Sequence, residues 1–546
     1  MSSIIGRITA TENKPTSCTT LRFWVKEGEV LRPFDVVRIP HIRDSYTYAM
    51  VQELLHITDS TGHLSNFVSS DFGEVDVEPQ NQRISTTIAE AEVLFNTREV
   101  EMPVKNGAQV EWADAEGIRE ALGLRAFKTP VPAGYIRNSN GIEVPVEFEA
   151  AYLLGPEGAH LNISGISGLA TKTSYAMFLL NAIQQCLGDR VTMVIFNVKG
   201  NDLLSIDIDN PDLTTEQREE WKKCGLNPEP FQNVTYLYPY AAREKTGYTN
   251  SHADPAILAQ QQMANRCMNY FYDVETARRK LPLLFSDIDD PNATIESIMH
   301  DIGDIECDSW DTFRNEIAER TVKGSSKAGD ISKASWRRFS RLLRSRTEHD
   351  LFTERSVKAE KRHRLIREAL AELERGDVLV IDIEPLPDYL QCLVVGDVIQ
   401  TIYAAKLGDD EDVDGSRLGT VVIFADELNK YAPKGADIAR SLTRSLLEVT
   451  ERGRSLGVIL FGAEQFRSGV HERVLGNCST NVYGRTTPIE ISKCPDFRHL
   501  SDTHKSVLSR LPQGTLLLQH AVFKTELVKV RFPHPCYYQP KAAITR

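Results

Sequence analysis

Four short runs of Val, Ile, Leu and Phe constrain the fold of this 546-residue chain more than any other feature. They occupy residues 191–198, 377–383, 420–425 and 456–463, and helix-like segments separate them. Strands that are apolar on both faces are typical of parallel sheets covered by helices on both sides. We therefore predict an α/β core built on a mainly parallel sheet.

A glycine-containing turn follows a further short strand, predicted at 161–165. The segment ISGISGLATKTSYA (163–176) contains this strand end, the turn and the start of a helix predicted over 173–187. Backbone N–H groups of such a turn and the helix N-terminus can surround phosphate oxygens, and a Lys adds positive charge. A hydroxyl after the Lys is suited to Mg²⁺, which assigns Thr173 to the metal. The predicted nucleotide-binding residues are Gly165, Ser167, Gly168, Leu169, Ala170, Thr171, Lys172, Thr173 and Ser174.

This turn departs from the commonest phosphate-binding pattern. Thr171 stands before the Lys, where that pattern has a Gly. Gly165 and Gly168 fit only if the loop is one residue longer than the common form. The alternative interpretation is an ordinary strand-to-helix turn that carries Lys-Thr.

Two acidic residues follow the apolar run 420–425. Open α/β sheets bind ligands at the carboxyl ends of their strands, which is where Asp426 and Glu427 stand. There Asp426 can bind Mg²⁺, and Glu427 can accept a proton from an attacking water. The alternative is a strand ending in a solvated Asp-Glu helix cap. The pair and the Lys-Thr turn, occurring in this order, together favour a P-loop site for ATP and Mg²⁺.

Other polar residues fit ATP hydrolysis. Gln465 follows the last apolar run, where an amide can orient water, or it is simply a surface cap. Arg452 and Arg454 lie at the end of a helix predicted over 437–452, and they could reach the nucleotide of a neighbouring subunit. Their alternative role is compensation of the helix dipole. Arg485 is a weaker candidate of the same kind.

The first hundred residues have the pattern of short β-strands. Leu21, Phe23 and Val25 alternate with more polar neighbours, and similar segments follow at 35–42 and 47–57. This spacing predicts a small barrel or a sandwich. The predicted domains are a barrel-like domain at 1–105, a connecting segment at 106–143, an ATPase core at 144–210 with 376–546, and a helical insert at 211–375.

Composition narrows the function classes. Lys and Arg number 63 against 76 Asp and Glu, a net charge of −13, which excludes a chain that coats nucleic acid with its whole surface. The nine cysteines are scattered without CxxC spacing, as in a reducing compartment. The chain begins without a basic-then-apolar signal, and no apolar run approaches the roughly 18 residues of a membrane span. We expect a cytoplasmic protein that does not enter a membrane.

With these motifs together, the chain resembles the HerA-like ATPases, hexameric DNA translocases in the same broad group as FtsK. The resemblance covers the β-rich N-terminal segment and most of the core, in the segments 144–176, 425–433 (ADELNKYAP), 451–465 (ERGRSLGVILFGAEQ) and 508–535. It implies a RecA-like core preceded by a small barrel. It also implies that Lys172 and Thr173 bind phosphate and Mg²⁺, Asp426 supports the metal, Glu427 is the base, Gln465 is the sensor and Arg452 is the best trans-acting finger.

The same resemblance implies a homohexamer that moves on double-stranded DNA and works with a nuclease-type partner in DNA processing or antiviral defence. The partner would dock on the N-terminal β-domain. A second hypothesis is a ring-shaped scaffold or regulator that uses ATP to assemble and activate an effector enzyme without translocation. A protein-remodelling ATPase is a third, although no aromatic-glycine pore loop is apparent.

A basic helix is the best DNA-contacting candidate. The segment 332–346 (SKASWRRFSRLLRSR) places Trp336, Phe339 and Leu343 at helical spacing among five arginines. One interpretation is an amphipathic helix with its apolar stripe inward and its Arg face solvated. The other is a surface that contacts phosphates. The mixed charges of 354–375 favour a solvated face.

Overall fold

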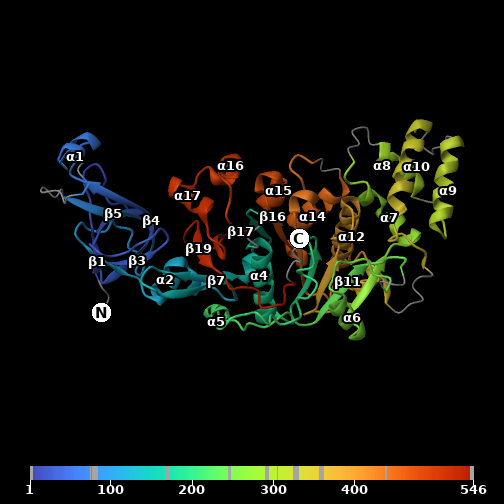
Figure 1. Ribbon diagram of the computed structural model, residues 1–546, viewed down its shortest axis with the longest axis horizontal. Helices are drawn as coiled ribbons and strands as arrows, with labels where there is room; N and C mark the ends of the chain where they lie inside the picture. Colours follow the sequence, from blue (N-terminus) through green and yellow to red (C-terminus); the bar gives the residue numbers. More distant parts are fainter. Residues whose placement is uncertain are drawn as a thin grey trace. The chain divides into compact units, whose positions relative to one another are not determined.

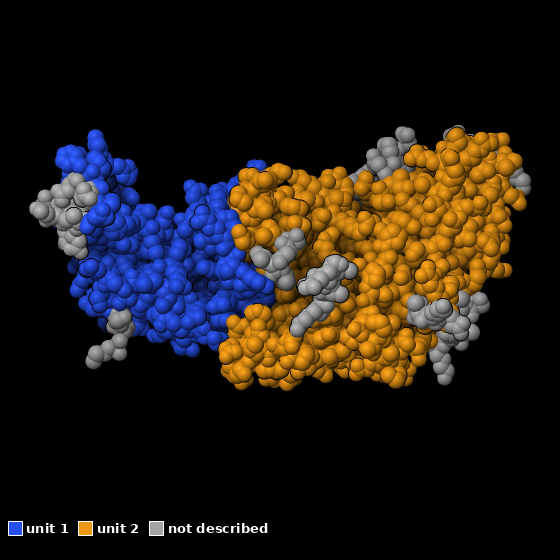
Figure 2. Space-filling view, in the orientation of Figure 1, with its two compact units in different colours: residues 1–149, 223–225, 496–532 blue, residues 150–222, 226–495, 533–546 orange. Residues whose placement is uncertain are grey.

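The computed structural model describes residues 4–69, 71–73, 75–76, 84–166, 171–243, 247–288, 294–303, 305–323, 331–355, 362–436 and 440–540. Contacts divide the chain into two compact units, coloured separately in Figure 2. Unit 1 contains residues 1–149, 223–225 and 496–532, and unit 2 contains residues 150–222, 226–495 and 533–546. The domain boundaries given above stay predictions.

Unit 1 begins with a closed antiparallel barrel, drawn in blue in Figure 1. Its strands are β1 (Ile4–Ile8), β2 (Thr20–Val25), β3 (Val36–His41), β4 (Ser45–Thr58), β5 (Ser85–Asn96) and β6 (Gln109–Trp112), in the order β1-β2-β5-β4-β3-β6. Alternate residues such as Leu21, Phe23 and Val25 point into its apolar core. The closed strand order confirms the barrel and not the sandwich. Closure leaves no sheet edge unpaired.

The rest of unit 1 joins segments that are remote in sequence. Strand β7 (Pro130–Arg137) pairs with β8 (Glu143–Glu149) and, at Tyr135, with β19 (Val528–Arg531), which pairs with β18 (Thr515–His520). The helices are α1 (His63–Ser69), α2 (Ala115–Leu122) and α17 (Asp502–Arg510). Regular structure thus continues through 106–143, the segment predicted to be a connection.

Unit 2 is built on a parallel sheet, as the apolar runs predict. Its strands are β9 (Leu161–Ser164), β10 (Val191–Asn197), β11 (Val234–Pro239), β12 (Cys267–Phe271), β13 (His363–Leu365), β14 (Val378–Asp382), β15 (Thr420–Asp426), β16 (Val458–Glu464) and β17 (Thr480–Tyr483). They follow in the order β13-β12-β11-β14-β10-β15-β16-β9-β17, and each pairing is parallel. One strand, β16, separates the strand of the Lys-Thr turn from the strand that ends in Asp426. The predicted α/β core with a mainly parallel sheet is thus present.

Helices complete unit 2, as Figure 1 shows. They are α3 (Ala150–Leu153), α4 (Thr171–Leu187), α5 (Thr215–Lys223), α6 (Pro255–Met263), α7 (Val274–Leu284), α8 (Thr294–Ile302), α9 (Trp310–Lys323), α10 (Lys333–Thr347), α11 (Ile366–Ala371), α12 (Asp388–Leu407), α13 (Leu428–Tyr431), α14 (Ser441–Leu456), α15 (Glu472–Gly476) and α16 (Pro488–Lys493). The insert is rich in helices, as expected, and in addition it extends the sheet through β11, β12 and β13.

Helix α12 is the most apolar helix of the core. By length and composition it could cross a membrane, but 72% of its most apolar 18-residue window is buried inside the structure. Val394, Val395 and Val398 belong to the main hydrophobic cluster of unit 2. Burial against other elements accounts for its apolar character.

Candidate nucleotide-binding site

The predicted phosphate and metal residues meet at the carboxyl edge of the parallel sheet. Helix α4 starts at Thr171, shortly after β9 ends, while β15 ends at Asp426. Asp426 pairs with Ala463 of β16. The residue after Ala463 is Glu464, which pairs with Ser164 at the end of β9. Three neighbouring strand ends therefore surround the start of α4, the edge at which open α/β sheets bind ligands.

A direct contact joins the two residues assigned to the metal. Thr173 Oγ1 donates a hydrogen bond to Asp426 Oδ2 at 3.2 Å, and Asp426 is 5% exposed. A hydroxyl and a carboxylate are both hard oxygen ligands of the kind that Mg²⁺ takes alongside phosphates and water. The residues present therefore fit a magnesium ion that completes its coordination with the nucleotide.

Lys172 is buried beside this pair and is only 7% exposed. Burial lowers the pKa of its ammonium group, and the charge of Lys199 lowers it further, whereas Asp426, Glu464 and Glu427 act in the opposite direction. The ammonium group lies at the start of a helix that follows a strand end, where it can donate hydrogen bonds to phosphate oxygens.

The candidate base, Glu427, has a strained backbone. Its φ and ψ are 60° and 45°, the left-handed region that residues other than glycine seldom adopt. Its N–H donates to Asp426 Oδ1 at 2.8 Å, and its side chain forms an ion pair with Lys199. Strain of this kind is concentrated at functional sites, where the surrounding structure maintains it.

The glycine turn is described only at its two ends. Gly165 is buried, and a Cβ there would lie 3.1 Å from Gly484 Cα, so the strand end leaves no room for a side chain. Ile166 N donates to Arg485 O at 2.8 Å. Ser174 lies with Thr173 in the first turn of α4. The predicted residues Ser167, Gly168, Leu169 and Ala170 lie outside the described residues.

Sequence reasoning missed a buried polar cluster beneath this edge. Glu464 is fully buried, and its Oε2 accepts a hydrogen bond from Asn162 Nδ2 at 2.8 Å. Arg467 in turn donates to Asn162 Oδ1. Burial raises the pKa of Glu464 to about 8, although the charges of Arg467 and Lys172 oppose the shift. Gln465, the predicted sensor, follows Glu464 at the same edge and is half-buried.

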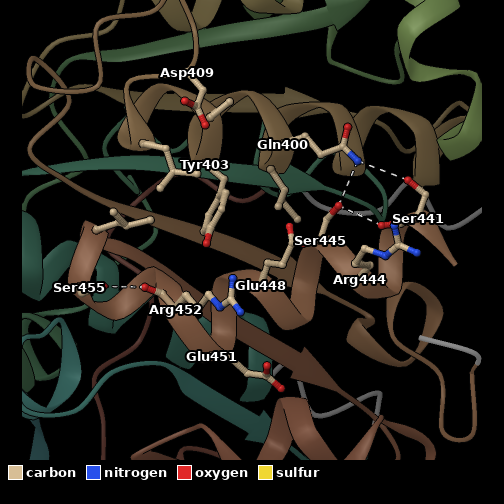
Figure 3. A pocket seen from close by; sticks show the side chains of 14 residues that line it. Gln400, Tyr403, Asp409, Ser441, Arg444, Ser445, Glu448, Glu451, Arg452 and Ser455 are labelled. Carbon is tan, nitrogen blue, oxygen red and sulfur yellow. Dashed lines mark hydrogen bonds between the residues drawn. The ribbon is translucent and has the colours of Figure 1, made fainter. Parts of the chain in front are cut away.

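The predicted trans-acting arginines do not contact this site in their own chain. Arg454 Nη1 donates to Glu157 O at 2.8 Å. Arg452 lines a pocket of about 760 Å³ between α12 and α14, where its side chain lies with those of Tyr403 and Glu448 (Figure 3). Both arginines lie just before β16 starts, whereas the site is at the other end of this strand of about 20 Å.

The basic helix α10 has an apolar face and a charged face. Trp336, Phe339 and Leu343 are buried and belong to the main hydrophobic cluster, and α10 packs against α9. Arg346 pairs with Asp287 at 2.6 Å. The remaining arginines are exposed and form no ion pair with the described residues; they are Arg337, Arg338, Arg341 and Arg344. The predicted inward apolar stripe is thus present, and the arginine face is open.

Comparisons with known proteins report a likeness of fold. No protein-family model and no curated protein matches the sequence. Among solved structures, the chain is similar to the bacterial conjugative coupling protein TrwBdeltaN70, with 14% identity and a TM-score of 0.43 over 73% of this chain and 89% of that chain. It is similar to VirB4 of Thermoanaerobacter pseudethanolicus, with 14% identity and a TM-score of 0.41 over 74% and 96%.

A shorter match is the genome packaging NTPase B204 from Sulfolobus turreted icosahedral virus 2, in complex with ATP-gammaS. The identity is 15% and the TM-score 0.23 over 31% of this chain and 72% of that chain. TrwB has been solved in complex with ADP and Mg²⁺. At these values the likeness assigns no role to a residue of this chain, so the roles below rest on the geometry of the site.

Proposed function

We propose that this chain is an ATPase whose catalytic site is formed by Lys172, Thr173, Asp426 and Glu427. The observation that carries the proposal is the contact between Thr173 and Asp426, beside the buried ammonium group of Lys172. An ordinary strand-to-helix turn does not require a lysine, a hydroxyl and two carboxylates to lie together. Binding and hydrolysis of a triphosphate with its magnesium ion require each of these groups.

Each residue has a role that follows from its chemistry. Lys172 binds the β- and γ-phosphate oxygens, and Thr173 with Asp426 would hold Mg²⁺, which stabilises the charge that develops on those oxygens. Water attacks the γ-phosphorus, the bond to the β–γ bridging oxygen breaks, and ADP leaves. Glu427 takes the proton from the water, and Gln465 orients it. For this step Glu427 must separate from Lys199.

We further propose that the site is completed between subunits of a homohexamer. Arg452 is exposed, and among the described residues it forms no ion pair. An arginine in that state can cross a subunit boundary and stabilise charge that develops only in the transition state, an effect of about 10³–10⁵ in rate. Arg454 is the second candidate for this role.

The substrate track we propose is double-stranded DNA. The four exposed arginines of α10 support it, because guanidinium groups with no acidic partner among the described residues suit phosphate contacts that are independent of sequence. We also propose a nuclease-type effector that docks on the barrel, in DNA processing or antiviral defence in the cytoplasm. Exposed apolar side chains between β4 and β5 support this; among them are Leu64 (75% exposed) and Phe72 (72% exposed).

The ion pair between Lys199 and Glu427 favours a second candidate function, a ring-shaped scaffold or regulator. A base held by a lysine would hydrolyse ATP slowly until a partner changes the site. In that case ATP keeps subunits assembled and positions an effector enzyme, and the chain does not move along DNA.

One experiment tests these proposals together. The ATPase rate and particle mass of the full chain are measured with and without duplex DNA, for the wild type and for Glu427→Gln. The motor predicts a hexamer, a several-fold faster rate with DNA, and a variant that binds ATP without hydrolysing it. Glu411→Gln, an exposed glutamate of the same unit, is the matched control. Unchanged hydrolysis in Glu427→Gln would remove Glu427 from the role of base.

A further inference from the structure

A second polar pocket lies in unit 1, apart from the nucleotide site. Its volume is about 490 Å³, within the range of pockets that bind small molecules. Three parts of unit 1 form it: residues 32–35 before β3, residues 136–141 at the turn between β7 and β8, and residues 512–515 with 529–531 around β18 and β19. The proposed ATP hydrolysis involves none of these residues.

Four cationic side chains line this pocket: Arg32, Arg137, Lys529 and Arg531. Lys529 and Arg531 are two residues apart on β19, so they lie on the same face of the sheet. Arg531 lies opposite Tyr135 of β7, and Arg137 is two residues beyond Tyr135. Three of the four cations therefore project from one sheet face.

This positive charge is poorly compensated. Arg32, Lys529 and Arg531 form no ion pair with the described residues, and the nearest carboxylate of Arg137 is that of Glu143, at 3.8 Å. Glu143 also pairs with Lys223 at 2.9 Å. Burial lowers the pKa of Lys529, the charge of Arg32 adds to the shift, and the charge of Asp35 opposes it. The chain as a whole has a net charge of −13, whereas this pocket gathers positive charge.

The pocket is held in shape by hydrogen bonds within unit 1. Asp35, which is 4% exposed, accepts from Arg32 N at 2.7 Å and from Ser139 N at 2.9 Å, so both of its oxygens are engaged. The side chain of Asn138 donates to Val36 O at 3.0 Å and accepts from Val36 N at 3.1 Å. Preorganisation lowers the entropic cost of binding.

We propose that this pocket binds a phosphate-bearing ligand. Phosphate suits it because guanidinium groups bind its oxygens in pairs, and because four cations line the pocket against the one carboxylate of Asp35 among its lining residues. The ligand has two sources of the same chemistry, a free nucleotide and the backbone of DNA. The proposal does not depend on ATP hydrolysis, because the pocket and the nucleotide site use different residues.

The test uses the full chain with Lys172→Ala, so that the loop site is weakened. Inorganic pyrophosphate is titrated by calorimetry into this chain and into the same chain carrying Lys529→Met and Arg531→Gln. We expect the double change to weaken binding at least tenfold. Lys529→Arg retains the charge and should retain binding. The matched control is Lys26→Met with Lys105→Gln, two exposed lysines of unit 1, which should leave binding unchanged.

Duplex DNA of 30 base pairs, followed by fluorescence anisotropy, distinguishes the two sources. If DNA is the source, Lys529→Met with Arg531→Gln reduces the slope of log affinity against log salt by about two, because each of these cations neutralises one phosphate. If pyrophosphate binding weakens and this slope is unchanged, the ligand is a free nucleotide. Equal pyrophosphate binding by the double variant and its matched control, with both chains melting at the same temperature, would overturn the proposal.

Discussion

Lys199 and Glu427 form an ion pair at the carboxyl edge of the parallel sheet, between the residue two positions after β10 and the residue that follows β15. Their side chains are 57% and 36% exposed. An ion pair this exposed contributes about 0–1 kcal/mol, so nucleotide binding can break it at little cost. It can therefore hold the proposed base inactive without locking it.

Replacing Lys199 tests this restraint. In Lys199→Met the carboxylate of Glu427 is free, so we expect basal ATP hydrolysis to rise several-fold and stimulation by DNA to shrink correspondingly. Steady-state phosphate release measures both. Lys434→Met, another exposed lysine of unit 2, should behave as the wild type. A lower basal rate in Lys199→Met would mean that Lys199 contacts the nucleotide instead.

Thr173→Val removes a hydroxyl from the proposed magnesium site with little change in volume. Because the metal loses one ligand, we expect the turnover rate to fall about 100-fold, or nearly 3 kcal/mol in activation free energy. The rate is measured across a Mg²⁺ titration, and the half-saturating concentration should rise. Thr215→Val, at an exposed threonine of the same unit, should leave both values close to those of the wild type.

The raised pKa of Glu464 should make the free energy of unfolding depend on pH. Its pKa is raised to about 8 in the folded chain, from an ordinary value of 4.5, so the folded state binds a proton that the unfolded state has released. Between about pH 4.5 and 8 this group alone lowers the free energy of unfolding as pH rises, by at most about 1.4 kcal/mol per pH unit. Glu464→Gln cannot titrate, so its melting temperature relative to the wild type should rise from pH 5 to 8. A constant difference would contradict the raised pKa.

Mixed assemblies test the proposed trans-acting role of Arg452. If each site borrows this residue from a neighbour, mixing Arg452→Ala subunits with Glu427→Gln subunits should restore ATPase activity that neither variant has alone, because one site can take Glu427 from one chain and Arg452 from the other. The rate is followed across mixing ratios at constant total protein. Arg444→Ala, on the same helix, provides the comparison. Mixed assemblies with no more activity than the two variants alone would indicate that Arg452 acts within its own chain.

The two faces of α10 should respond differently to mutation. Trp336 is fully buried, so Trp336→Ala should reduce the free energy of unfolding by about 3–5 kcal/mol. Replacing Arg337, Arg338, Arg341 and Arg344 together by Gln should change stability little while weakening duplex DNA binding. Denaturant melts and DNA anisotropy separate the two effects. Unchanged DNA binding in the quadruple variant would exclude this face as the DNA contact.

Much of the core and part of the site could be predicted from local patterns. Runs such as 420–425 are apolar on both faces, which is enough to predict parallel strands, and the polar residues that end them must meet at one edge. This reasoning predicts that Lys172, Thr173 and Asp426 lie together, and the structure brings them together. For the N-terminal domain, the alternation of apolar and polar residues did not distinguish a barrel from a sandwich.

The remaining features depend on pairings between remote segments. Lys199 could have been found by applying the strand-end rule to β10 as well as to β15. The same rule places Glu464 at the end of β16, but it does not predict the hydrogen bond from Asn162, which also accepts from Arg467, because these residues come from different elements. Likewise, residues 496–532 belong to the N-terminal unit because β19 pairs with β7. The paired residues, Arg531 and Tyr135, are 396 positions apart in the sequence.

The three strands that residues 211–375 add to the parallel sheet have a practical consequence. Strand β11 covers the side of β14 that β10 leaves open, and apolar side chains such as Trp336 share one cluster with the core. A shortened chain without this segment would expose the backbone groups of β14 along a full strand, a template for aggregation. A shortened chain prepared for crystallisation should therefore retain this region.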